Sequence, residues 1–153
     1  AKMTKRILQE LKYDKKTIQD VALLVELHLR PHTFKMGWTD SAVRRYIVDA
    51  GEVLDDLNNL VRADVTTKNK QKAQEIYDKL DEMENKIKDV LEKEEMSKLR
   101  PPITGDEIME IFNLEPGPKV GLIMKALYEQ RINEGEVSKE DAIKLAEDIF
   151  KNL

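Results

Sequence analysis

Two histidines and one aspartate are the residues of this sequence with the clearest potential to ligate a metal ion. His28 and His32 are the only histidines and lie four residues apart, and Asp64 follows an apolar helical segment. Imidazole and carboxylate groups are common ligands of divalent metals. Pro31 lies between the histidines and disturbs the helical spacing that would align their rings. His28, His32 and Asp64 are therefore weak metal candidates, and structural histidines near a helix end are the preferred interpretation.

No complete catalytic pattern accompanies them. The chain contains no cysteine, which excludes a thiolate nucleophile, a Cys-based zinc site and a disulfide framework. A Ser-His-Asp arrangement, a Gly-rich phosphate loop after a strand and a distinctive pair of carboxylates are also missing. We predict no catalytic residue and a function in binding or positioning.

A Pro-Gly-Pro turn at residues 116–118 joins two helical segments. The second segment begins beside Lys119, and exposed amides at a helix N-terminus bind phosphate. The arrangement is that of a helix-hairpin-helix, which binds the nucleic-acid backbone without reading sequence. Gly117, Lys119 and Gly121 are therefore candidate phosphate contacts. In the alternative interpretation, Gly117 only forms the turn and Gly121 only permits close helix packing.

Further basic residues extend the candidate RNA-binding set, since Lys and Arg contact backbone phosphates. Arg44 and Arg45 lie one helical turn after Trp38, Lys68 and Lys70 lie at the start of the predicted long helix, and Arg100 directly precedes the paired prolines. A solvated charged surface is the alternative for each of them.

The elements that position these residues are predicted to be helices, because apolar residues recur at three- and four-residue steps and Lys, Glu and Leu are abundant. Residues 32–38 lack this period and are predicted to be a loop, with Thr39 as the N-cap of the next helix. A capping box is predicted at Ser138 to Asp141. The expected helices cover residues 7–11, 14–29, 39–50, 53–64, 69–95, 106–113, 119–133 and a last segment after Ser138.

The fold class is therefore predicted to be all-α. Paired prolines after Arg100 divide the chain into a helical body, residues 1–99, and a tail with a helix-hairpin-helix-like turn, residues 100–153. The helix over 69–95 would be about 40 Å long at about 1.5 Å per residue. Its apolar stripe must pack on other helices, or it forms a homodimer seam.

Composition limits the cellular location that we expect for the protein and the kinds of partner that it can bind. No apolar run is long enough to span a bilayer and no signal peptide opens the chain, so a soluble, cytoplasmic protein without membrane contact is expected. Residues 1–48 hold ten Lys and Arg against five Asp and Glu, whereas residues 49–153 hold sixteen against twenty-five. A nucleic-acid partner would therefore need local basic surfaces.

Several gap-free stretches resemble one protein family. They are residues 24–32 (LVELHLRPH), 37–46 (GWTDSAVRRY), 62–69 (RADVTTKN), 99–109 (LRPPITGDEIM) and 116–121 (PGPKVG). Together they resemble the C-terminal half of bacterial tRNA nucleotidyltransferases of the poly(A) polymerase type, the CCA-adding enzymes that carry an HD-type domain behind the catalytic head.

The resemblance implies an RNA-binding role and tRNA as the partner. The Gly-Ser signature and paired aspartates of the catalytic head, which uses Mg, ATP and CTP, are not in this sequence, so the chain is expected to be inactive alone and to need that domain from a parent chain. No His-Asp dipeptide occurs, and only Asp64 matches the last HD aspartate, with His28 and His32 as auxiliary candidates.

The leading hypothesis is thus a tRNA-binding C-terminal region, expected to be a fragment of a CCA-adding or poly(A)-synthesising enzyme, that holds tRNA by backbone contacts. A residual HD-type metal-dependent phosphohydrolase is one alternative. A structural module that dimerises through the long helix is another.

Overall fold

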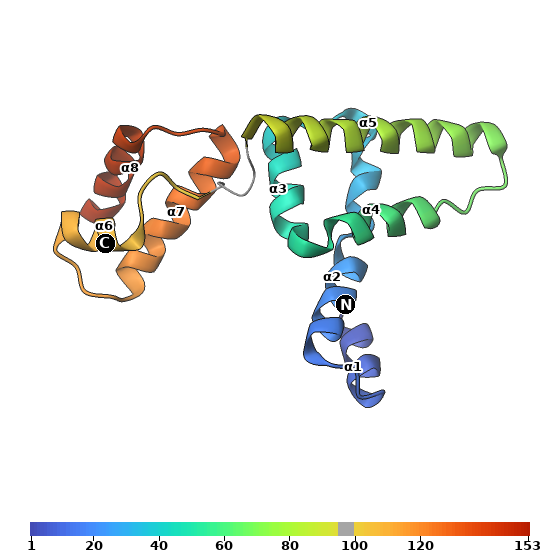
Figure 1. Ribbon diagram of the computed structural model, residues 1–153, viewed down its shortest axis with the longest axis horizontal. Coiled ribbons are helices and arrows are strands. Elements are labelled where there is room, and N and C mark those ends of the chain that lie inside the picture. Colours follow the sequence, from blue (N-terminus) through green and yellow to red (C-terminus); the bar gives the residue numbers. More distant parts are fainter. Residues whose placement is uncertain (95–99) are drawn as a thin grey trace. The chain divides into compact units, whose positions relative to one another are not determined.

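The computed structural model describes residues 1–94 and 100–153, and every regular element in these ranges is helical (Figure 1). The predicted all-α class is confirmed. Contacts divide the chain into two compact units, unit 1 (residues 1–89) and unit 2 (residues 90–153). The boundary predicted before Arg100 falls within unit 2. The described residues include no apolar helix of the length that a membrane span requires.

Five α-helices and two short 3-10 helices build unit 1 and the segment that leads out of it. The α-helices are α1 (Lys2–Glu10), α2 (Lys15–Leu27), α3 (Asp40–Ala50), α4 (Leu54–Ala63) and α5 (Lys70–Glu94), and the 3-10 helices are η1 (Arg30–Met36) and η2 (Gly51–Val53). The loop predicted over 32–38 was wrong in part, because η1 covers most of it. Pro31 provides the backbone angle for its start and Phe34 anchors it at 4% exposure. So short a 3-10 turn shows no 3.6-residue period.

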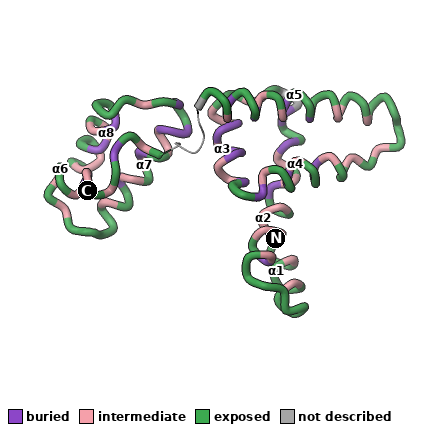
Figure 2. The backbone as a smooth tube through the Cα atoms, viewed as in Figure 1, coloured by how far each residue is buried: buried purple, intermediate pink, exposed green. Residues whose placement is uncertain are grey.

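The core of unit 1 forms where α2, α3, α4 and α5 meet. Tyr46, Leu57 and Met83 are completely buried, and the hydroxyl of Tyr46 donates a hydrogen bond to Asn58 Oδ1 at 3.1 Å. Burial raises the pKa of Tyr46. Figure 2 shows buried positions on α3, α4 and the C-terminal half of α5 and none on α1. The predicted apolar stripe of the long helix is therefore buried within the chain from Leu80 onward.

Three α-helices build unit 2 around a separate core. They are α6 (Gly105–Phe112), α7 (Pro118–Glu134) and α8 (Lys139–Lys151). The core residues are Ile103, Ile108, Ile123, Leu127, Ala142 and Ala146, and the rings of Phe112 and Phe150 lie 4.9 Å apart at its edge. Unit 2 thus holds α6 and α7 together as a hairpin through its own apolar residues.

Side-chain caps define several helix starts. The predicted N-caps Thr39 and Ser138 are confirmed, since their hydroxyls accept hydrogen bonds from the backbone N–H groups of Ala42 and Asp141. The reciprocal capping box was not predicted where it occurs: Thr104 Oγ1 accepts from the Glu107 N–H, and Glu107 Oε2 accepts from the Thr104 N–H at 2.7 Å. This box fixes the start of α6.

Glu107 is expected to make the stability of unit 2 depend on pH. Lys139 Nζ donates to its Oε1 at 2.6 Å, and this bond, followed by that from the Thr104 N–H, lowers the Glu107 pKa below 4.5. A lowered folded-state pKa contributes stability above the unfolded value and loses it as the pH falls through the folded value. We expect Glu107→Gln to flatten the loss of unit 2 stability below pH 4.5.

Amide NMR signals of residues 105–151, followed against pH, measure this effect. Glu110→Gln is the matched control because Glu110 is an exposed carboxylate on the same helix. An unchanged acid profile in Glu107→Gln, or an equal change in Glu110→Gln, would contradict the prediction.

Candidate nucleic-acid interface

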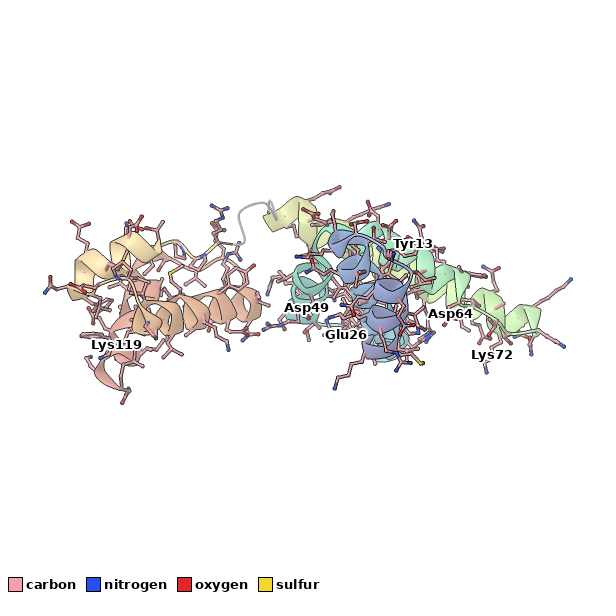
Figure 3. All side chains as sticks on the ribbon, turned by 90° about the horizontal axis from the view of Figure 1, so that it is seen from below. Tyr13, Glu26, Asp49, Asp64, Lys72 and Lys119 are labelled. Atoms are coloured by element: carbon pink, nitrogen blue, oxygen red, sulfur yellow. The ribbon has the colours of Figure 1, made fainter. Side chains whose placement is uncertain are left out.

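The turn between α6 and α7 presents the start of α7 to solvent. Asn113 ends α6 in the left-handed conformation, which asparagine tolerates, and Gly117 is the N-cap of α7 with Pro118 at its first position. Among the described residues, no side chain caps this helix. Residues 115–119 are exposed, and Lys119 is labelled on its helix in Figure 3. The start of α7 is therefore exposed, without a side-chain cap, beside one cationic side chain.

The glycines of this turn are not required by the packing of the chain. A Cβ added at Gly121 would meet nothing within 4 Å, and a Cβ at Gly117 would lie 3.8 Å from the carbonyl oxygen of Glu115, an ordinary contact. Gly117 has a φ of 177°, an extended conformation that any residue adopts. Close helix packing thus does not explain Gly121, and backbone conformation does not explain Gly117. Both positions leave room for an external group to approach the backbone.

Apolar residues beneath the turn hold it in place. Ile108 is completely buried, and Phe112, Val120 and Met124 pack against the unit 2 core. Lys119 lies outside this packing, so a change of its charge leaves the core intact.

Two of the candidate RNA-binding residues lie at the connection between α4 and α5. Lys68 and Lys70 are exposed there, and Asp64 and Lys72 mark this part of unit 1 in Figure 3. Asn69 Oδ1 accepts a hydrogen bond from the Lys72 N–H at 3.1 Å and caps α5. Arg62 of α4 binds Glu84 of α5 through Nε at 2.8 Å and also contacts Asp81, which ties the two helices together. Arg100 is exposed in unit 2, at the start of the second described range.

The pair on α3 divides into one buried and one accessible residue. Arg44 is only 7% exposed, so we remove it from the candidate phosphate contacts. The sequence pattern suggested exposure because Arg44 is charged, but the face of α3 that carries it is turned into unit 1. Arg45 is half-buried and lines a surface pocket with Trp38.

That pocket includes residues that no sequence pattern identified. Arg30, Thr33 and Ala42 line it together with Trp38 and Arg45. Arg30 and Thr33 come from η1, most of which was predicted to be a loop, and Ala42 carries no functional group in its side chain. The only sequence signal was an aromatic residue, Trp38, near two arginines, and the spacing of these residues does not by itself indicate a pocket.

The structure does not bring His28, His32 and Asp64 together as a metal site. His28 Nδ1–H donates to the Val25 carbonyl at 2.8 Å at the end of α2, His32 is exposed in η1, and Asp64 is the C-cap of α4. Within residues 1–94 and 100–153, no group of three or more His, Asp or Glu side chains is arranged to hold a metal ion. No geometric observation favours the phosphohydrolase alternative.

Comparisons with known proteins support the resemblance. The family model for tRNA nucleotidyltransferase domain 2 matches residues 1–146. The chain is 32% identical over 144 residues to the CC-adding tRNA nucleotidyltransferase of Thermus thermophilus, covering 93% of this chain and 30% of that protein. It is 30% identical over 134 residues to the A-adding tRNA nucleotidyltransferase of Deinococcus radiodurans, covering 86% of this chain and 29% of that protein.

No solved structure matches the chain. The chain spans less than one third of the length of the two curated relatives. The family match covers most of its residues, including both units. The chain therefore belongs to the tRNA nucleotidyltransferase domain 2 family.

Proposed function

We propose that this chain is the tRNA-binding C-terminal region of a tRNA nucleotidyltransferase and that it positions tRNA through its backbone phosphates. The observation that carries this proposal is the open turn before α7, where two glycines without a packing role flank Pro118 and Lys119. Helix N-termini bind anions through backbone amides and the helix dipole. In a family whose named members act on tRNA, the matching anion is an RNA phosphate.

Binding of tRNA phosphates by this chain would depend on shape and on local positive charge, and not on the overall charge. The net charge of the chain is −4, so no general attraction draws RNA to it. Lys68 and Lys70 in unit 1, and Arg100 and Lys119 in unit 2, are exposed cations that supply local contacts. Because such contacts go to phosphates and not to base edges, the binding is expected to tolerate different tRNA sequences.

Nucleotide addition itself belongs to another part of the longer protein in this proposal. The curated relatives add CC or A, and about 70% of their length lies outside the match to this chain. The catalytic domain would use Mg with ATP or CTP, while this chain would keep the tRNA in position. A cytoplasmic location would follow from that role.

Binding of labelled tRNA lacking its CCA end, measured by fluorescence anisotropy, tests the proposal directly. The logarithm of affinity should fall linearly with the logarithm of salt concentration, because phosphate contacts release counterions. Binding should differ little among tRNA sequences. Absence of binding at low salt would overturn the proposed function.

Gly121→Ala separates the RNA-binding role of this glycine from its structural role. Alanine is favoured over glycine in an exposed helical position by about 1 kcal/mol, and no neighbour within 4 Å opposes the added methyl group. We therefore expect α7 to become more stable while tRNA affinity falls, since the methyl group obstructs approach of a phosphate to the backbone. Thermal unfolding and tRNA anisotropy measure the two quantities.

Glu134→Ala, near the other end of the same helix, controls for unrelated changes at exposed positions of α7. A gain in stability with unchanged tRNA affinity in Gly121→Ala would show that RNA does not approach this glycine.

A further inference from the structure

A surface pocket in unit 1 lies between η1 and the beginning of α3. Its volume is about 220 Å³, and its lining residues are Arg30, Thr33, Trp38, Ala42 and Arg45. The pocket is open to solvent and its walls are mainly apolar. Sites that enclose a whole small molecule typically measure about 300–1,000 Å³. This pocket is therefore suited to one planar group of a larger ligand.

The indole of Trp38 is held in place before any ligand binds. Its Nε1–H donates to Thr33 Oγ1 at 3.1 Å, and the Thr33 hydroxyl donates to the Arg30 carbonyl at 2.7 Å. The ring packs against Tyr46 at 5.0 Å between centroids and meets Phe34 edge to face at 5.6 Å. Because the indole N–H already has an acceptor, the contribution of Trp38 to a ligand is the surface of its ring.

The Trp38 backbone is anchored as well. Lys86 of α5 donates from Nζ to the Trp38 carbonyl and forms an ion pair with Asp40 at 3.4 Å. A fixed aromatic ring stacks on a planar partner with little loss of conformational entropy, because its rotamer is already selected. The pocket thus has a preorganised stacking wall.

Cationic groups border this wall. Arg30 Nη1 donates to Asp49 Oδ2 at 2.6 Å, and the two side chains are 39% and 32% exposed. A guanidinium has five N–H donors, so a single bond to Asp49 leaves donors of Arg30 for a second anion. Arg45 adds a second guanidinium to the lining. The guanidinium of Arg30, which has donors beyond its bond to Asp49, favours a ligand with a negative charge.

We propose that this pocket binds one unpaired nucleotide of the RNA, with its base against Trp38 and its phosphate beside Arg30 and Arg45. Proteins recognise unpaired RNA by stacking splayed bases on aromatic rings or guanidinium planes and by pairing the backbone with cations. The pocket provides an aromatic wall, two guanidinium groups and space for one group. The inference rests on the proposed RNA-binding function and adds a base-stacking site in unit 1 to the phosphate contact at the α7 turn.

The protein carries its own reporter, because Trp38 is its only tryptophan. Tryptophan fluorescence of the 153-residue chain is titrated with single-stranded RNA, a blunt RNA duplex of the same length, AMP and inorganic phosphate at equal ionic strength. Single-stranded RNA is expected to quench the fluorescence saturably at concentrations at which the other three have no effect.

Two pocket variants and one charge control accompany the titration. Ala42→Leu fills the pocket and should weaken binding of single-stranded RNA about tenfold, as expected for loss of one base-stacking contact. Arg45→Gln removes a cation and should weaken it by about the same factor, as expected for loss of one charged hydrogen bond to phosphate. Arg6→Gln removes a cation from exposed α1 and should leave the affinity unchanged. Circular-dichroism melting verifies that each variant is folded. If Ala42→Leu does not fold, Arg45→Gln and the comparison of the four ligands still test whether the pocket binds a nucleotide.

The outcomes separate this inference from the proposed function. If labelled tRNA binds but single-stranded RNA fails to quench Trp38, or both pocket variants bind like the wild type, the pocket assignment is wrong and the proposed function stands. Quenching by phosphate or AMP equal to that by RNA also overturns it, in favour of an anion or mononucleotide site. In a third outcome, single-stranded RNA quenches Trp38 fluorescence and the pocket variants weaken its binding, but labelled tRNA does not bind. The pocket assignment then stands and the proposed tRNA-binding function is wrong.

Discussion

Replacing Lys119 with Glu is expected to weaken tRNA binding by about tenfold or more at low salt. A hydrogen bond to a charged group contributes roughly 1.5–3 kcal/mol, and the substitution removes one and places an anion against the phosphate. Each neutralised phosphate adds roughly 0.7 to 0.9 to the slope of log affinity against log salt, so the slope should become shallower by about one contact. Anisotropy titrations of labelled tRNA at several salt concentrations measure both quantities.

Lys151→Glu is the matched charge reversal. Lys151 is also exposed and lies in unit 2, but it closes α8 and pairs with Asp148 at 3.4 Å, away from the predicted turn in sequence. Since Lys119 takes no part in the core, both variants should remain folded. Equal losses of affinity in the two variants, or no loss in either, would show that the turn is a packing device and not a phosphate site.

Ile123→Ala is expected to destabilise unit 2 by about 2–5 kcal/mol, the usual range for truncation of a buried Ile or Leu. Ile123 is completely buried in the cluster that holds α6, α7 and α8 together. Natural domains are stable by only about 5–15 kcal/mol, so this loss would populate unfolded unit 2. Urea unfolding followed through the amide signals of residues 105–151 gives the free energy of unfolding, and tRNA affinity should fall as the turn loses its support.

Leu122→Ala is the control for the same helix. Leu122 directly precedes Ile123 but is 51% exposed, so its truncation leaves no cavity and should change the free energy of unfolding by only a few tenths of a kcal/mol. Comparable destabilisation by the two substitutions would mean that Ile123 does not belong to the core of unit 2.

The helices of this protein were predictable because their determinants are local. Apolar residues at three- and four-residue steps indicated the helices and, from Leu80 onward, the buried face of α5, and Thr39 and Ser138 marked helix starts through hydrogen bonds within one turn. The all-α class followed from the same patterns. The helical periodicity did not predict η1, because this 3-10 helix after Pro31 has no 3.6-residue period and depends on burial of Phe34.

The candidate site was only partly predictable. The exposed turn before α7 came from Pro-Gly-Pro and Lys119, residues adjacent in sequence. The pocket around Trp38 joins Arg30 and Thr33 of η1 to Ala42 and Arg45 of α3, and its geometry depends on an indole that Tyr46 and Phe34 hold in place. No local pattern identifies such a combination.

By itself, the sequence determined the helical class, the turn at residues 116–121 and the family resemblance. Each depends on residue type, on short-range spacing or on gap-free stretches of similar sequence. The tertiary structure decided which charged residues face solvent: Arg44 and Arg45 are neighbours in sequence, but helical geometry turns the first into unit 1 and leaves the second at the pocket. It also showed that Gly117 and Gly121 lack a packing role. Burial and open space are relations among residues distant in sequence, and only the packed helices specify them.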